Sequence, residues 1–76
     1  MEVDLVIERP GKPTLLIEIK SKNSITPDDI RHLKLIAHDI TPSESLCLSQ
    51  DTVAKIIDGV NCLHWEEGLH RIFKDS

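Results

Sequence analysis

The chain has 76 residues, of which 39% are hydrophobic and 3% aromatic, and its formal net charge is −4 at pH 7. A chain of this length forms one domain, expected to span residues 1–76, and buries only about 60% of the surface that it exposes when unfolded. The acidic balance argues against a protein that holds nucleic acid by bulk electrostatic attraction.

The sequence predicts a cytoplasmic protein without a membrane partner. No apolar run approaches the roughly 18 residues that cross a bilayer, and the first residues, MEVDLVIERP, lack the pattern of a signal peptide. Cys47 and Cys62 are expected to remain reduced, because a single pair is not the disulfide framework of a small secreted domain.

A β-hairpin is predicted at the start of the chain. Alternating and β-branched residues over 2–8 and again over 14–20 indicate two strands, and the sequence RPGKP between them indicates a tight turn. A hairpin that is symmetric about Gly11 places Asp4 opposite Glu18.

A helix is predicted next. Thr26 suits the N-cap, Pro27 the first helical position and Asp29 the third, and the apolar spacing continues the helix to Ile40. The apolar residues 45–49 then predict a strand parallel to the second one. Weaker signals predict a short helix, a strand and a terminal helix over 52–57, 61–64 and 65–73. The fold class is therefore α/β, with a small mixed sheet (an antiparallel hairpin plus a parallel strand) flanked by helices.

The hairpin also collects charge on one face. Four side chains emerge there because strand side chains alternate: Glu2, Asp4, Glu18 and Lys20. The odd-numbered apolar residues, from Val3 to Ile19, take the other face and are expected to pack against a helix. These charges have two explanations. They are the ordinary solvated face of a sheet, or they form a binding site, because carboxylates that face each other repel and need a neutralising partner.

A divalent cation would supply that partner. Mg²⁺ and Mn²⁺ prefer oxygen ligands, and Mg²⁺ is commonly held by one or two carboxylates, with water or phosphate oxygens in its other positions. Protonated Lys20 is not a ligand, but it is suited to orient a water molecule or to stabilise charge that develops on a phosphate.

The pattern of Asp4, a turn and then Glu18-Ile19-Lys20 resembles the signature of the PD-(D/E)XK nuclease superfamily. The chain is also similar, over nearly its whole length and including the tail CLHWEEGLHRIF, to the nuclease-like C-terminal domain of AAA-type ATPases. The resemblance implies that Asp4, Glu18 and the carbonyl of Ile19 bind Mg²⁺ or Mn²⁺ and that Lys20 is the catalytic lysine. It also implies Glu2 as an additional ligand candidate and DNA, or alternatively RNA, as the substrate.

The chain departs from the superfamily core, which usually has a helix and a strand before the Asp strand. A truncated restriction-endonuclease-like core is therefore expected, with residues 2–8 forming an open sheet edge. An apolar open edge invites pairing with a second copy, so a homodimer or a higher oligomer is expected.

Further polar residues are candidates for contacts with the nucleic-acid backbone: Ser21, Lys22, Arg31 and Lys34. The alternative is that they are ordinary solvated side chains. Three functions remain open from the sequence. The favoured one is a metal-dependent nuclease that hydrolyses phosphodiester bonds of DNA. The alternatives are an inactive assembly or accessory domain with the same fold, and a DNA-binding regulator, against which the acidic net charge weighs.

Overall fold

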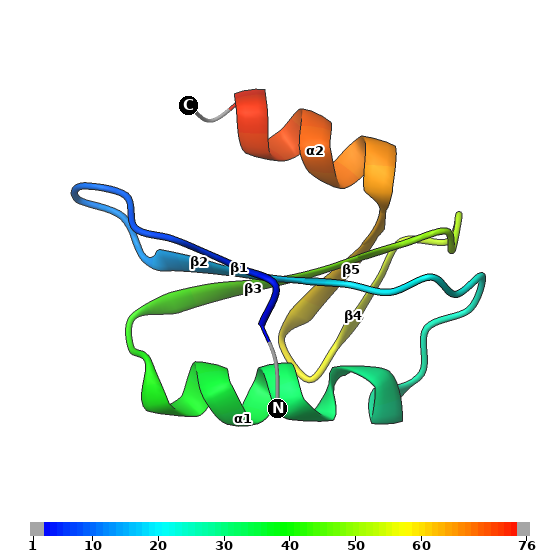
Figure 1. Cartoon of the computed structure of the whole chain (residues 1–76), viewed down its shortest axis with the longest axis horizontal. Coiled ribbons are helices and arrows are strands. Elements are labelled where there is room, and N and C mark those ends of the chain that lie inside the picture. Colours follow the sequence, from blue (N-terminus) through cyan, green and yellow to red (C-terminus); the bar gives the residue numbers. More distant parts are fainter. Residues whose placement is uncertain (1–2, 75–76) are drawn as a thin grey trace.

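The structure, a computed structural model, describes residues 3–74, which form a five-stranded sheet with a helix on each face (Figure 1). The predicted mixed α/β class is confirmed. The strands, in the sheet order β1-β2-β3-β5-β4, are β1 (Leu5–Ile7), β2 (Thr14–Ile19), β3 (Ser43–Ser49), β5 (Val60–His64) and β4 (Lys55–Ile57). The helices are α1 (Arg31–Asp39), which follows a 3-10 turn over Pro27–Ile30, and α2 (Trp65–Lys74). Within residues 3–74, no helix is long and apolar enough to cross a membrane.

The sheet combines antiparallel and parallel pairs. β1 and β2 form the predicted antiparallel hairpin, and β3 is the predicted parallel neighbour of β2. The hairpin register pairs Val6 with Leu16, as symmetry about Gly11 predicts. Gly11 has a φ of 73°, a conformation that glycine adopts without the steric cost of a side chain.

A strand replaces the short helix predicted over 52–57, so that prediction was wrong. β4 runs antiparallel to β5 through a turn at Asp58 and Gly59, whose φ angles are 50° and 84°. Positive φ at both central residues is the geometry of a tight two-residue hairpin. Pairing with β5 therefore decides the conformation of this segment, which its local sequence leaves ambiguous.

The α1 face of the sheet holds the larger part of the apolar core. Leu16 of β2 and Cys47 of β3 are fully buried beneath Leu33 of α1. Glu18 follows Leu16 by one strand period, so its side chain lies on this same face. The face of the hairpin that carries the predicted charge cluster is therefore covered in part by α1.

The α2 face is packed over the middle of the sheet and open at its β1 side. Ile17 and Leu48 are buried there, and a Cβ at Gly68 of α2 would overlap a methyl group of Leu48, so helix and sheet approach closely. Leu5 and Ile19, which were predicted to pack against a helix, remain about half exposed. The difference arises because α2 crosses β3 and β5 instead of covering the hairpin.

β1 is shorter than the strand predicted over 2–8. The Oδ2 atom of Asp4 accepts a hydrogen bond from the backbone N–H of Ile19 (2.7 Å), in place of the ladder that a longer strand would continue. The chain before β1 leaves the sheet toward α1, and Val3 packs against the core on that face (Figure 1). β1 is an edge of the described sheet, and Val6 is 54% exposed.

The entry into α1 has the predicted cap. The Oδ2 atom of Asp29 accepts hydrogen bonds from the backbone N–H and the hydroxyl of Thr26 (2.8 and 3.0 Å). Lys22 Nζ lies 2.9 Å from Asp29 Oδ1, and Pro27 opens the 3-10 turn. These contacts fix the loop after β2 to the start of the helix and hold α1 over the end of β2.

Candidate metal and phosphate site

Glu18 is a buried carboxylate near the end of β2. Its side chain is 9% exposed, and its Oε2 atom has no hydrogen-bond partner within the described part of the chain. Burial raises the pKa of Glu18, the positive charge of Lys20 lowers it, and the negative charge of Asp4 raises it further. An unpartnered buried carboxylate oxygen costs stability, so this position suits a partner that supplies positive charge.

Lys20 lies on the same face as Glu18 and closer to solvent. Its Nζ atom is 3.8 Å from Glu18 Oε1, and its side chain is 34% exposed. This separation is an ion pair and too long for a hydrogen bond. The ammonium group therefore offsets part of the carboxylate charge and retains the ability to donate hydrogen bonds to a ligand.

Asp4 completes the cluster at the sheet edge. Its Oδ2 atom bonds the N–H of Ile19, and Asp4 acts electrostatically on Glu18. The N–H and C=O groups of one residue in a strand point to the same side, so the carbonyl of Ile19 faces the edge that Asp4 occupies. The structure thus gathers Asp4, Glu18, Ile19 and Lys20 in one place, while Glu2 lies outside the described residues.

The cluster fits a cation that needs few protein ligands. No group of three or more His, Cys, Asp or Glu side chains in residues 3–74 lies close enough together to hold a metal ion. Mg²⁺ commonly takes only one or two carboxylates and fills its other positions with water and phosphate oxygens. Asp4 and Glu18 with a backbone carbonyl satisfy that requirement, and the unpartnered Oε2 of Glu18 is the atom that a cation would satisfy.

Three of the four residues predicted to contact nucleic acid have acidic partners. The ion pairs are Lys22 with Asp29, Arg31 with Asp28 and Lys34 with Asp58. The Lys34 pair joins α1 to the β4–β5 turn, away from β2. Ser21 and Lys22 directly follow Lys20, and the exposed hydroxyl of Ser21 extends the polar surface from the cluster.

The sequence analysis missed Asp51, which fastens the loop beyond β3. Asp51 Oδ2 accepts a hydrogen bond from the N–H of Ile25 (3.0 Å) and lies 2.9 Å from Lys55 Nζ. Its Oδ1 atom accepts a hydrogen bond from the N–H of Val53 (2.9 Å). The hydrogen bond from Lys55 is the main cause of a pKa lowered to about 2. Asp51 thereby ties the loop after β2, next to the cluster, to the loop after β3. The only signal in the sequence for this role was an acidic residue directly after a strand.

Replacing Asp51 by asparagine is expected to weaken the dependence of stability on acid pH. The folded-state pKa of about 2 lies below the ordinary aspartate value of about 3.9, so ionised Asp51 stabilises the fold above that ordinary value. This contribution is lost as the pH falls toward about 2. Urea unfolding followed by circular dichroism should show Asp51→Asn to be less stable than wild type at neutral pH and equal to it at the acid end. Asp39→Asn, an exposed carboxylate at the end of α1, is the control; an unchanged pH slope in Asp51→Asn contradicts the expectation.

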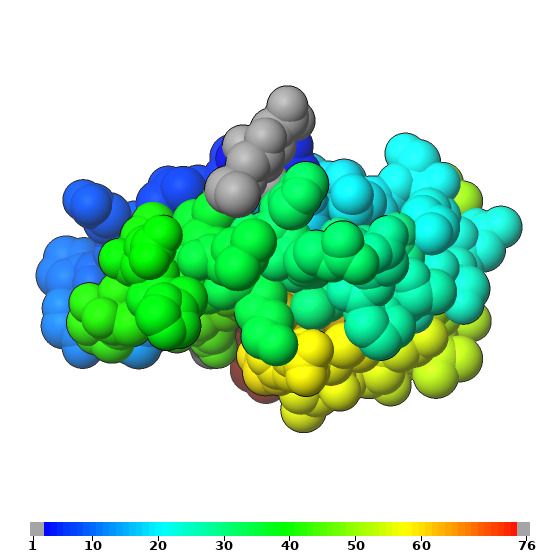
Figure 2. Space-filling view, turned by 90° about the horizontal axis from the view of Figure 1, so that it is seen from below, coloured from blue at the N-terminus to red at the C-terminus, as the bar shows by residue number. Residues whose placement is uncertain are grey.

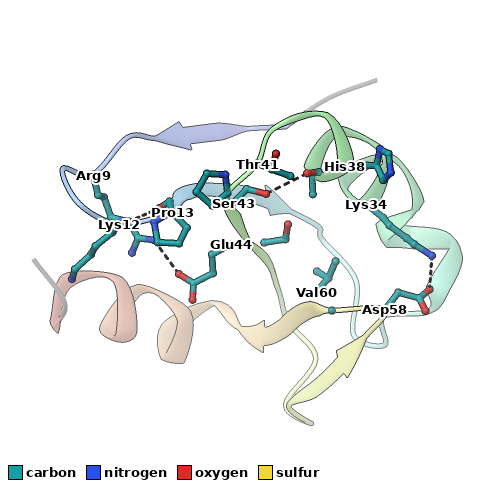
Figure 3. Close-up of a pocket in the computed structure, with 14 residues that line it drawn as sticks. Arg9, Lys12, Pro13, Lys34, His38, Thr41, Ser43, Glu44, Asp58 and Val60 are labelled. Atoms are coloured by element: carbon teal, nitrogen blue, oxygen red, sulfur yellow. Dashed lines mark hydrogen bonds and ion pairs between the residues drawn. The ribbon is translucent and has the colours of Figure 1, made fainter.

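A broader hollow lies at the opposite end of the sheet, between the β1–β2 turn, the end of α1 and the β4–β5 turn (Figure 3). Its charged walls are neutralised, because Arg9 pairs with Glu44 (3.1 Å) and Lys34 with Asp58 (3.4 Å). β2 and β3 start at this end, whereas Glu18 lies near the end of β2. Ligands of open α/β sheets bind beyond the carboxyl ends of the strands, so we assign the site to the Glu18 cluster.

Comparison with known families gives one match. The model of a family described as a domain of unknown function, DUF4143, matches residues 1–67. The chain belongs to the DUF4143 family. For this DUF4143 domain, neither a comparison with curated proteins nor one with solved structures gave a match. Its function is therefore argued from the Glu18 cluster.

Proposed function

We propose that this DUF4143 domain is a Mg²⁺- or Mn²⁺-dependent nuclease of the PD-(D/E)XK type that hydrolyses phosphodiester bonds of DNA. One observation carries the proposal: the carboxylate of Glu18 is buried and one of its oxygen atoms has no partner. Burial also raises the pKa of Glu18, which means that the ionised form is disfavoured at this position. A buried polar group without a partner is costly and commonly has a functional role. Such a nuclease also requires a second carboxylate and a lysine ammonium group, and the neighbouring Asp4 and Lys20 supply them.

In the proposed reaction, Asp4, Glu18 and the Ile19 carbonyl hold the cation. When bound, the cation supplies a water of lowered pKa and offsets the charge of the phosphate. Lys20 donates hydrogen bonds to the attacking water or to a phosphate oxygen, where negative charge grows in the transition state. Glu18 must be ionised to bind the cation, and Lys20 favours that form because it lowers the pKa of Glu18.

The proposal is tested with the purified wild-type chain and a panel of plasmid, single-stranded and branched DNA, with an RNA of matched sequence. Incubation with Mg²⁺ or Mn²⁺ is expected to cut at least one DNA form, and a chelator is expected to stop the reaction. Glu18→Ala should be inactive on every form, while Glu44→Gln, at the other end of the sheet, should cut like wild type. If only RNA were cut, the proposed substrate would be RNA instead of DNA. Equal cleavage by wild type and Glu18→Ala would overturn the proposal.

An accessory role without catalysis is the second candidate, and one observation favours it. Within residues 3–74, no three His, Cys, Asp or Glu side chains lie close enough together to hold a metal ion. The Glu18 cluster therefore offers a cation only two carboxylates from the described part of the chain. A domain that has kept the fold for assembly alone should bind the cations weakly and cut none of the nucleic acids in the panel.

We also propose that the domain acts in the cytoplasm, a reducing compartment, because Cys47 and Cys62 are free although they are direct neighbours on β3 and β5.

We further propose that the domain forms a homodimer or a higher oligomer through β1. Leu5, Val6 and Ile19 expose apolar surface around this open sheet edge. Exposed apolar edge strands pair readily with another strand, and a second copy always offers one. Among antiparallel registers, the one centred on Val6 would set Asp4 against Glu8 of the other copy, and like charges directly opposite are unfavourable. A register centred on Ile7 avoids that repulsion.

Sedimentation velocity at micromolar concentration measures this assembly. Wild type is expected to sediment as a dimer or larger species, and Val6→Lys as a monomer, because a lysine at the edge blocks pairing. Val53→Lys is the control, since Val53 is equally apolar and 63% exposed but lies outside β1. A monomeric wild type, or a Val6→Lys variant that assembles like wild type, contradicts the proposal.

A further inference from the structure

The side of α1 that faces the Glu18 cluster follows from one ion pair of the helix and from the order of the strands beneath it. Lys34 pairs with Asp58, so its flank faces the β4–β5 turn. His32 and Ile36 lie one turn apart on the opposite flank, because successive residues of a helix are rotated by about 100°. The sheet order places β4 and β5 at one edge and β2 and β1 at the other. The flank with His32 therefore faces β2 and the start of the chain.

The surface seen from the α1 side agrees with this orientation. Figure 2 shows α1 in green between the blue residues of the first strand on one side and the yellow residues of the β4–β5 region on the other. His32 is exposed and is the second residue of α1. Its charge acts on Glu18 and lowers the pKa of that carboxyl, which supports the same placement.

Other basic residues of α1 are directed elsewhere. Arg31 pairs with Asp28 in the preceding turn, and Lys34 pairs with Asp58. His38 lies at the far end of the helix, beside Asp39 and the hollow at the opposite end of the sheet. These pairs make Arg31 and Lys34 less suitable contacts for nucleic acid than the sequence predicts.

We propose that His32 is the residue by which α1 contacts the phosphate backbone of nucleic acid bound at the Asp4–Glu18–Lys20 cluster. This inference rests on the proposed nuclease function. A role as a metal ligand does not fit, because Asp4, Glu18 and His32 do not come close enough to hold one ion together. An imidazole N–H is a good donor to a phosphate oxygen, and His32 would hold the nucleic-acid backbone from the α1 side of the cluster. The charges of Lys20, Asp4, His32 and Asp29 all act on Glu18.

Affinity for fluorescently labelled DNA, measured by anisotropy in Ca²⁺, tests the contact without cleavage. His32→Ala is expected to weaken DNA binding about tenfold, which corresponds to the loss of one hydrogen bond to a charged group. His32→Gln keeps a donor and should restore most of the affinity. His38→Ala, an exposed histidine on the same helix, should bind DNA like wild type. Mn²⁺ affinity, measured by calorimetry without DNA, should change far less than DNA affinity in His32→Ala, because His32 is not a ligand of the cation.

The outcomes separate this inference from the proposed function. Wild type that binds neither Mn²⁺ nor DNA overturns the nuclease proposal and the role of His32 together. Wild type that binds both, with His32→Ala indistinguishable from it, overturns only the role of His32. A His32→Ala variant that loses Mn²⁺ affinity as strongly as DNA affinity also overturns it, because His32 would then act through the carboxylates.

Discussion

Glu18→Gln is expected to stabilise the protein in the absence of metal and to abolish its stabilisation by Mg²⁺ or Mn²⁺. The wild-type carboxylate is buried with an unpartnered Oε2 atom, which costs about 1 kcal/mol or more. A neutral amide has a smaller desolvation cost, so the melting temperature should rise by about 4–8 °C for each kcal/mol recovered. A residue whose removal stabilises the fold is typical of a functional site.

The pH dependence of this gain follows from the raised pKa of Glu18. Below the ordinary glutamate value of about 4.3 the residue is protonated in both the folded and the unfolded state, so wild type and Glu18→Gln should be equally stable there. Above that value Glu18 ionises more readily in the unfolded chain than in the folded protein, where its pKa is higher. The wild type therefore loses stability as the pH rises toward the folded-state pKa. The advantage of Glu18→Gln should therefore appear only toward neutral pH.

Thermal unfolding with and without cations measures both effects. A cation present at a hundred times its dissociation constant stabilises the folded state by about 2.7 kcal/mol, so the wild type should melt well above its metal-free temperature. Glu18→Gln should melt at the same temperature with or without Mn²⁺. Glu44→Gln, an exposed glutamate on β3, should keep the wild-type response. A Glu18→Gln variant that is less stable than wild type at neutral pH, or that still responds to Mn²⁺, contradicts the expectation.

The order of the first elements could be predicted because local signals agree there. Gly11 between two prolines fixes the hairpin, and Thr26, Pro27 and Asp29 mark the start of the helix with side chains that have defined roles. The register that sets Asp4 beside Glu18 follows from the symmetry of the turn. The strand β4 was missed because its conformation depends on pairing with β5, which local sequence does not encode.

Details of the site depend on contacts between distant residues, and these were not predictable. Asp4 was expected inside a strand over residues 2–8, opposite Glu18, but its carboxylate accepts a hydrogen bond from the N–H of Ile19 and lies just before β1. Glu18 was expected either on a solvated face or in a binding site, and it is buried on the face of the sheet that α1 covers. The sequence singled out Arg31 and Lys34 on α1 as contacts for nucleic acid; the structure shows that Lys34 faces the β4–β5 turn and leaves His32 on the opposite flank.

Lys20→Ala is expected to keep every ligand of the cation and to lower the rate of DNA cleavage by about 100- to 1000-fold, the usual effect of removing one donor that stabilises transition-state charge. Lys20 is not a ligand, so its loss removes no oxygen from the cluster. It does remove the positive charge that lowers the pKa of Glu18. The pKa of Glu18 should therefore rise further, and the Mn²⁺ affinity of Lys20→Ala should approach that of wild type only as the pH is raised.

This pH dependence separates a catalytic lysine from a merely structural one. Single-turnover cleavage and Mn²⁺ affinity are measured together for wild type, Lys20→Ala and Lys20→Arg, at neutral and at alkaline pH. If Lys20 acts only through the ionisation of Glu18, alkaline pH should restore both affinity and rate to Lys20→Ala. If it stabilises the transition state, the rate stays low after the affinity has recovered, and Lys20→Arg regains part of it because a donor and a positive charge are restored. Lys74→Ala, which removes an exposed lysine on α2, should match wild type in both measurements.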